Sequence, residues 1–165
     1  MISKRLLKHV ALPPWLVRRA FTPAVMRAIE AAIAASEKHH CGQIRFAVEE
    51  TLTLAELWRG KTGRERALEV FADLRVWDTE QNNGVLVYLL LADRDVEIVA
   101  DRGIHHAVGE AAWEAVCRAM ETALHAGQYE TAGVSGVEAI GALIAQHFPR
   151  HVAGKNELPD VPIVL

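Results

Sequence analysis

Residues 82–99 read NNGVLVYLLLADRDVEIV, and this stretch decides most of the fold. A nearly continuous apolar run over residues 85–91 is typical of a strand that is buried on both faces. The charged residues 93–95 then form a short turn, and a second extended run follows over residues 96–100. The stretch therefore predicts an antiparallel hairpin whose first strand lies inside a sheet.

The residues before the hairpin predict two helices and a first strand. Thr22-Pro23 is a capping hydroxyl followed by proline at the first helical position, and Gly42 is expected to end that helix. Alternation of apolar and polar residues over 44–48 predicts a strand with one polar face. Thr62 and Glu65 match a capping box that opens the next helix.

Two further apolar stripes, over residues 113–124 and 137–148, predict long helices after the hairpin. The order strand, helix, strand makes the first two strands parallel, joined by a right-handed crossover. Together these elements predict an α/β fold, a three-layer α/β/α sandwich with a small mixed β-sheet. Along the chain we expect a basic amphipathic arm over residues 1–21, the domain itself over 22–150, and an extended tail over 151–165.

The composition suits one compact domain of 165 residues, of which 51% are hydrophobic and 24% charged. A net charge of -3 provides no basic footprint for nucleic acid, so we expect no nucleic-acid partner. Residues 1–21 carry five cations and no acid, which is compatible with packing on the domain and with peripheral contact to a membrane. The two cysteines, the lack of a signal-peptide pattern and the lack of an apolar run of about 18 residues predict a cytoplasmic protein.

Chemistry is expected where the parallel strands end, because ligands of open α/β sheets bind outside the carboxyl ends of their strands. Glu49 follows the first strand, and Asp93, Arg94 and Asp95 follow the second. Glu49, Asp93 and Asp95 are candidate ligands of a divalent cation, because Ca²⁺ and Mg²⁺ prefer oxygen ligands. Asp93 and Arg94 are candidate catalytic residues, since a metal can activate water while a guanidinium pairs with phosphate. The competing interpretation is a solvated turn, in which aspartate is common.

The order of these motifs resembles the TPM domain, the family of the thylakoid lumen phosphatase and photosystem II repair proteins. The matching pieces are Gly42-Gln43-Ile44, residues 66–71, Asn82-Asn83-Gly84, Asp93-Arg94, Gly103 and Gly127-Gln128-Tyr129. The resemblance covers residues 22–160 and is strongest to the intracellular branch, which has no signal or membrane anchor. It implies an α/β/α sandwich, and it implies acid phosphatase activity or binding of calcium or another divalent metal, since members with each property are described.

The chain departs from that family at two places. Exported members place an aspartate just before the first helix, where this chain has Phe21-Thr22-Pro23, and they more often carry Gly-x-Gly where it has Asp101-Arg102-Gly103. The missing acid leaves two hypotheses open. The chain is either a metal-dependent phosphatase acting on a small phosphomonoester, or a non-catalytic module that binds a cation or a protein partner and assists assembly or stress response.

Overall fold

The computed structural model of the chain describes residues 4–13, 15–150 and 155–165. Its helices are α1 (Lys4–Ala11), α2 (Leu16–Ala20), α3 (Pro23–Ser36), α4 (Leu54–Trp58), α5 (Gly63–Asp73), α6 (Arg102–Val108), α7 (Glu110–His125) and α8 (Tyr129–His147). Its strands are β1 (Gln43–Glu49), β2 (Gly84–Leu90), β3 (Asp95–Ala100) and β4 (Ile163–Val164).

The strands form one mixed sheet in the order β3-β2-β1-β4. Strands β1 and β2 are parallel, with Gln43 opposite Gly84 and Glu49 opposite Leu90. Strands β2 and β3 are antiparallel, with Leu90 opposite Asp95. All seven residues of β2 are buried, as expected for a strand covered on both faces. The predicted hairpin and the predicted parallel pair are both confirmed.

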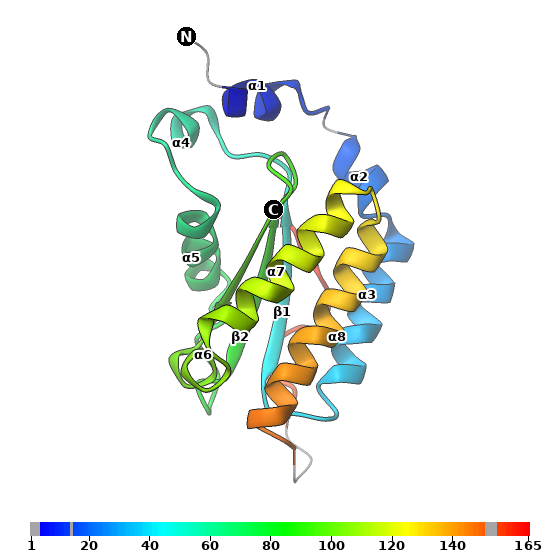
Figure 1. The fold of residues 1–165 in the computed structure, drawn as a ribbon, viewed down its shortest axis with the longest axis vertical. Coiled ribbons are helices and arrows are strands. Elements are labelled where there is room, and N and C mark those ends of the chain that lie inside the picture. Colours follow the sequence, from blue (N-terminus) through cyan, green and yellow to red (C-terminus); the bar gives the residue numbers. More distant parts are fainter. Residues whose placement is uncertain (1–3, 14, 151–154) are drawn as a thin grey trace.

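Helices cover both faces of this sheet and produce the predicted three-layer α/β/α sandwich (Figure 1). Helices α3, α7 and α8 lie on one face, and α5 lies on the other. Alternate strand residues point to the two sides: Val87 joins the core beneath α3, α7 and α8, and Leu86 joins the smaller core beneath α5. The sheet is therefore the shared wall of two apolar cores of unequal size.

The helix starts obey the local capping rules. The hydroxyl of Thr22 accepts a hydrogen bond from the backbone N–H of Val25 at 3.3 Å, so the predicted start of α3 is confirmed. Thr62 and Glu65 form the predicted reciprocal capping box at α5. The predicted end of the first helix is wrong, because α3 stops at Ser36 and the chain turns several residues before Gly42.

Strand β1 differs from the expected strand with one polar face, because its first six residues are all buried. The chain end covers the polar side chains. Oε1 of Gln43 accepts a hydrogen bond from the backbone N–H of Leu158 at 3.1 Å, and Arg45 donates to the carbonyl of Pro159 at 2.9 Å. The chain then adds β4 parallel to β1. The part of the expected tail that the structure describes thus completes the domain, and residues 151–154 lie outside the described residues.

The expected N-terminal arm contains two short helices, and the boundary expected after residue 21 falls between α2 and α3. Helix α1 lies across one end of the sandwich, beside the segment that carries α4 (Figure 1). Within the described ranges, none of the helices combines the length and the apolar character needed to cross a membrane.

Candidate functional site at the carboxyl edge of the sheet

The parallel strands β1 and β2 end at the same edge of the sheet, as the sequence predicts. Glu49 is the last residue of β1, Asp93 and Arg94 lie in the β2–β3 turn, and Asp95 begins β3. Arg94 has a φ of 54°, the left-handed conformation that closes this tight turn. The four predicted site residues therefore come from one edge, but their side chains have different partners.

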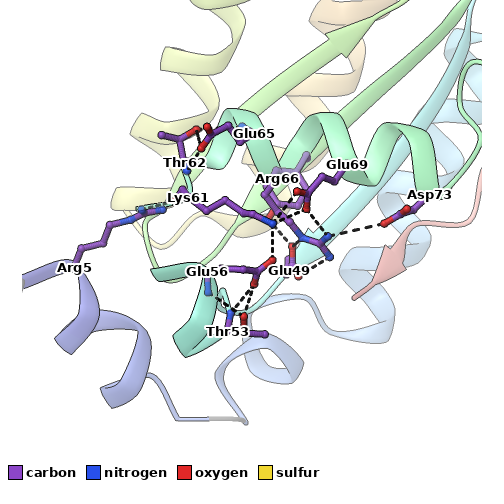
Figure 2. A network of polar contacts seen from close by, with 11 residues as sticks. Arg5, Glu49, Thr53, Glu56, Lys61, Thr62, Glu65, Arg66, Glu69 and Asp73 are labelled. Atoms are coloured by element: carbon purple, nitrogen blue, oxygen red, sulfur yellow. Dashed lines mark hydrogen bonds and ion pairs between the residues drawn. The ribbon is translucent and has the colours of Figure 1, made fainter. Parts of the chain in front are cut away.

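The carboxylate of Glu49 is held on all sides by neighbouring side chains (Figure 2). Arg66 of α5 binds it with two hydrogen bonds, Nε to Oε2 at 2.8 Å and Nη2 to Oε1 at 3.0 Å. The hydroxyl of Tyr88 donates to the same Oε2 at 2.6 Å. Burial of the phenol, and next its hydrogen bond to Glu49, raise the pKa of Tyr88, so the hydroxyl keeps its proton and remains a donor. This arrangement gives Glu49 a structural role, the docking of α5 on the sheet.

A second set of charges extends this network toward solvent (Figure 2). Nζ of Lys61 lies 2.9 Å from Oε1 of Glu56 and 2.8 Å from both carboxylate oxygens of Glu69. Glu56 also completes a capping box with Thr53 at the start of α4. These pairs connect α4 to α5 and were not predicted from the sequence, because nothing local marks Lys61 as the partner of either acid.

Asp93 is covered by the N-terminal helix α1. Nε of Arg5 donates to Oδ2 of Asp93 at 2.8 Å, and Nη1 of Arg5 donates to the carbonyl of Lys61 at 2.6 Å. Nε2 of His9 lies 3.2 Å from the same carboxylate oxygen. Nδ1 of His9 accepts a hydrogen bond from the backbone N–H of Leu52 at 3.1 Å, which leaves the proton of the neutral ring on Nε2, facing Asp93. Helix α1 is thereby fastened to the edge of the sheet through this aspartate.

Asp95 packs against the first turn of α5 and against α7. A Cβ atom at Gly63 would collide with its carboxylate, so a larger residue there would force the Asp95 side chain to move. Burial raises the pKa of Asp95, and repulsion from Glu121 and Asp93 adds to the rise. The surroundings of Asp95 therefore disfavour its charged form.

Two hollows meet at this corner. One, of about 380 Å³, is lined by Arg5, Thr62, Gly63, Asp93, Arg94, Asp95, Glu121 and His125. The other, of about 400 Å³, runs under α1 and shares Asp93, Arg94 and His125 with the first. Arg94 is exposed between them. The corner thus presents three carboxylates together with the cationic and imidazole groups of Arg5, Arg94 and His125.

Asp93, Arg94 and Asp95 line one hollow, whereas Glu49 is bound by Arg66 and Tyr88 in a separate network. Among residues 4–13, 15–150 and 155–165, no three His, Cys, Asp or Glu side chains are arranged closely enough to hold one metal ion. Sequence reasoning missed Arg5, Glu121 and His125. The spacing of Glu121 and His125, four residues apart on one helix face, was the available signal for two of them.

Comparisons with known proteins place the chain in a family. The family model of the TPM domain matches residues 18–143, which is most of the chain. The NMR structure of BA42 protein from the psychrophilic bacterium Bizionia argentinensis superposes with a TM-score of 0.76 at 29% sequence identity, over 87% of this chain and 94% of that one. No curated protein sequence matches significantly. The chain belongs to the TPM domain family.

Proposed function

We propose that the chain is a non-catalytic, cytoplasmic binding module that takes up a divalent cation, Ca²⁺ or Mg²⁺, at Asp93 and Asp95, with Glu121 as a further ligand. The observation that carries this proposal is that these three carboxylates line one hollow. They are not close enough in the described structure to hold one ion together, so binding requires the side chains to move toward one another, with water completing the coordination. Like charges held together in a half-buried corner repel one another, and a hard cation with oxygen ligands removes that repulsion.

Glu49, the third ligand expected from the sequence, is replaced by Glu121 in this proposal. Both oxygens of Glu49 are occupied by Arg66, and Tyr88 also donates to one of them. Releasing Glu49 would leave the half-buried guanidinium of Arg66 without its main partner, which is costly. Glu121, by contrast, makes one long hydrogen bond, from the backbone N–H of Val96 at 3.3 Å.

Arg5 occupies the place of a competing cation. Its guanidinium binds Asp93, and its charge offsets part of the rise that burial, Glu121 and Asp93 produce in the pKa of the neighbouring Asp95. An incoming divalent ion therefore competes with Arg5 for the carboxylate of Asp93. Cation binding and release of α1 from the sheet edge are then linked, because both depend on the same carboxylate.

The test is a titration of metal-free protein with Ca²⁺ and Mg²⁺, followed by NMR amide shifts. We expect shifts centred on residues 93–95 and on α7 near Glu121, lost in Asp95→Asn. Arg5→Gln should bind the cation several-fold more tightly, because the competing guanidinium is gone. Glu49→Gln should bind with unchanged affinity, although it weakens the fold, and Asp73→Asn is the control for loss of an exposed carboxylate elsewhere. Unshifted spectra at millimolar metal, or loss of binding in Glu49→Gln alone, would contradict the proposal.

Metal-dependent hydrolysis of a phosphomonoester is the second candidate, and one observation favours it. Arg94 is exposed at the junction of the two hollows, beside Asp93 and near Lys8 and His125, where a phosphate would meet several cationic groups. Turnover of para-nitrophenyl phosphate that requires Mg²⁺ and is lost in Arg94→Ala would establish it and would overturn the non-catalytic assignment. Our proposal predicts no turnover above that of the Arg94→Ala variant.

A further inference from the structure

The end of the molecule that carries α1 and α4 exposes an unusual number of large apolar side chains. In α1, Leu7 is 61% exposed and Val10 is 63% exposed. In α4, Leu54 is 56% exposed and Trp58 is 79% exposed, and Trp15 at the start of α2 is 56% exposed. We call these five residues the apolar end. They make up half of the exposed large hydrophobic residues of the described chain.

These side chains belong to one surface. Arg5 of α1 binds the carbonyl of Lys61, just beyond α4, and His9 of α1 binds the backbone N–H of Leu52, just before it. Figure 1 shows α1 across one end of the sandwich, with α4 near one end of α1 and α2 following its other end. Arg5 and His9 use the inward face of α1. Leu7 and Val10 lie on the other side of the helix and are largely exposed.

The charges around the apolar end are basic. Lys4, Lys8, Arg18 and Arg19 are exposed in the N-terminal helices, and Arg59 is exposed directly after α4. Residues 4–20 contain no acid, whereas the chain as a whole carries a net charge of -3. The guanidinium of Arg19 lies 5.8 Å from the ring centroid of Trp15, so a cation and an indole are presented together.

We propose that the apolar end binds the surface of an anionic membrane, with Leu7, Val10 and the two tryptophans entering the headgroup region and the basic side chains contacting lipid phosphates. Apolar side chains flanked by lysine and arginine on short helices are the pattern of interfacial binding, and tryptophan favours the membrane–water boundary. Helices of eight and five residues lie on a bilayer and are too short to span it. Each basic residue near an anionic surface adds to the attraction between the protein and the bilayer.

A membrane accounts for this surface better than a protein partner does, because exposed apolar and exposed basic side chains alternate along the same short helices. The charged residues that border the apolar stripe of α1 are all basic, which complements an anionic lipid surface. The remaining net charge, -8 over residues 22–165, would keep the rest of the molecule away from an anionic bilayer and set its orientation.

The experiment is co-sedimentation of the full chain with vesicles of phosphatidylcholine, with and without phosphatidylglycerol, at low and high salt. We expect binding only to the anionic vesicles, weakened by salt. The variant Leu7→Glu/Val10→Glu should bind at least about tenfold more weakly, since it places two acids in the apolar stripe. Leu68→Glu/Trp77→Glu makes the same charge change at exposed residues away from this end and should bind within about twofold of the wild type, allowing for its lower net charge.

Circular dichroism of both variants verifies that the fold is retained, as expected for residues that lie outside both cores. A second readout is the fluorescence of Trp58 and Trp15, which should shift to the blue on vesicle binding. Equal loss of binding in the two double variants would mean that binding depends only on the net charge of the protein. That result would contradict the assignment of the apolar end as the binding surface. Wild-type binding that is absent, or that is the same with and without phosphatidylglycerol, would overturn the proposal itself.

Discussion

The two helical layers of this domain are attached to the same sheet by different forces. Helices α3, α7 and α8 pack through a large apolar core in which glycines of α8 allow close contact: Gly133 meets Ile29, and Gly136 meets Met120. Helix α5 packs through a smaller core supplemented by the Arg66–Glu49 pair and its neighbours (Figure 2). Apolar burial depends little on pH and salt, whereas charge pairs depend on both.

The difference explains why the carboxylates at the edge of the sheet have divergent roles. We call α5 and its contacts with the sheet the polar layer, and α3, α7 and α8 with theirs the apolar layer. Glu49 belongs to the polar layer, where Arg66 binds its carboxylate and so docks α5 on the sheet. Asp93 lies only a few residues beyond the neighbouring strand, yet it holds the N-terminal helix α1 and faces a hollow. Two acids that look equivalent in the sequence thus have different kinds of partner, since Glu49 pairs with α5 on one face of the sheet and Asp93 pairs with α1 at the end of the sandwich. Mutations in the two layers should therefore change the stability of the fold to different extents.

The largest effect is expected from Arg66→Met in the polar layer. This change removes the cation but keeps much of the aliphatic stem, so it leaves the carboxylate of Glu49 half-buried beside a single phenol. We expect a loss of about 3 kcal/mol in the free energy of unfolding, measured by urea denaturation. The carboxylate left without its partner, and not the lost packing, should account for most of this loss.

A double-mutant cycle separates those two causes. Glu49→Gln combined with Arg66→Met removes both charges, and we expect the double variant to recover at least about 1 kcal/mol relative to the sum of the single changes. Strictly additive losses would mean that the pair has no coupling, and the docking of α5 would then be attributed to its apolar core alone.

The next largest effect is expected in the apolar layer, from Gly141→Ala. A Cβ atom at this position of α8 would collide with the hydroxyl of Ser36 in α3, which lies 2.9 Å from Nε2 of His40. Overpacking at such a contact costs about 2 kcal/mol, which thermal unfolding would show as a lower Tm. Gly103→Ala is the matched control, because Gly103 is also helical and a Cβ there has nothing within 4 Å. Alanine at Gly103 should stabilise slightly, by up to about 1 kcal/mol. Similar behaviour of the two variants would exclude close helix packing as the reason for Gly141.

How much could be predicted from the sequence depends on how far apart the interacting residues lie along the chain. The start of α3 at Thr22-Pro23 and the hairpin around Asp93 depend on neighbours a few residues away, so capping and periodicity rules suffice. Strand β4 has two residues and no periodicity of its own, and it exists only because β1 offers an edge. The partner of Asp93 is Arg5, 88 residues away. Nothing in the sequence distinguishes Arg5 from the other arginines, so the covering of the candidate site by α1 could not be predicted.

The smallest effect is expected at the solvent-exposed margin of the polar layer, from Glu69→Gln. The side chain of Glu69 is 45% exposed, and its hydrogen bonds from Lys61 are its main interaction. Exposed pairs contribute little, so the loss should be below about 0.5 kcal/mol and should vanish in high salt.

The small stabilisation by the Lys61–Glu69 pair should depend on pH in a definite direction. The hydrogen bond from Lys61 holds the pKa of Glu69 below its ordinary value of 4.5, so the stabilising contribution is present above that value and is lost as the pH falls through the lower pKa of the folded state. Urea unfolding should therefore show a larger difference between variant and wild type at pH 7 than at pH 3. A loss as large as that of Arg66→Met would mean that the exposed and half-buried charges of Figure 2 act as one cooperative network. The contrast between the two layers would then be one between an apolar core and a cooperative charge network. The burial of each charge pair on the α5 side would no longer predict how much that pair stabilises the fold.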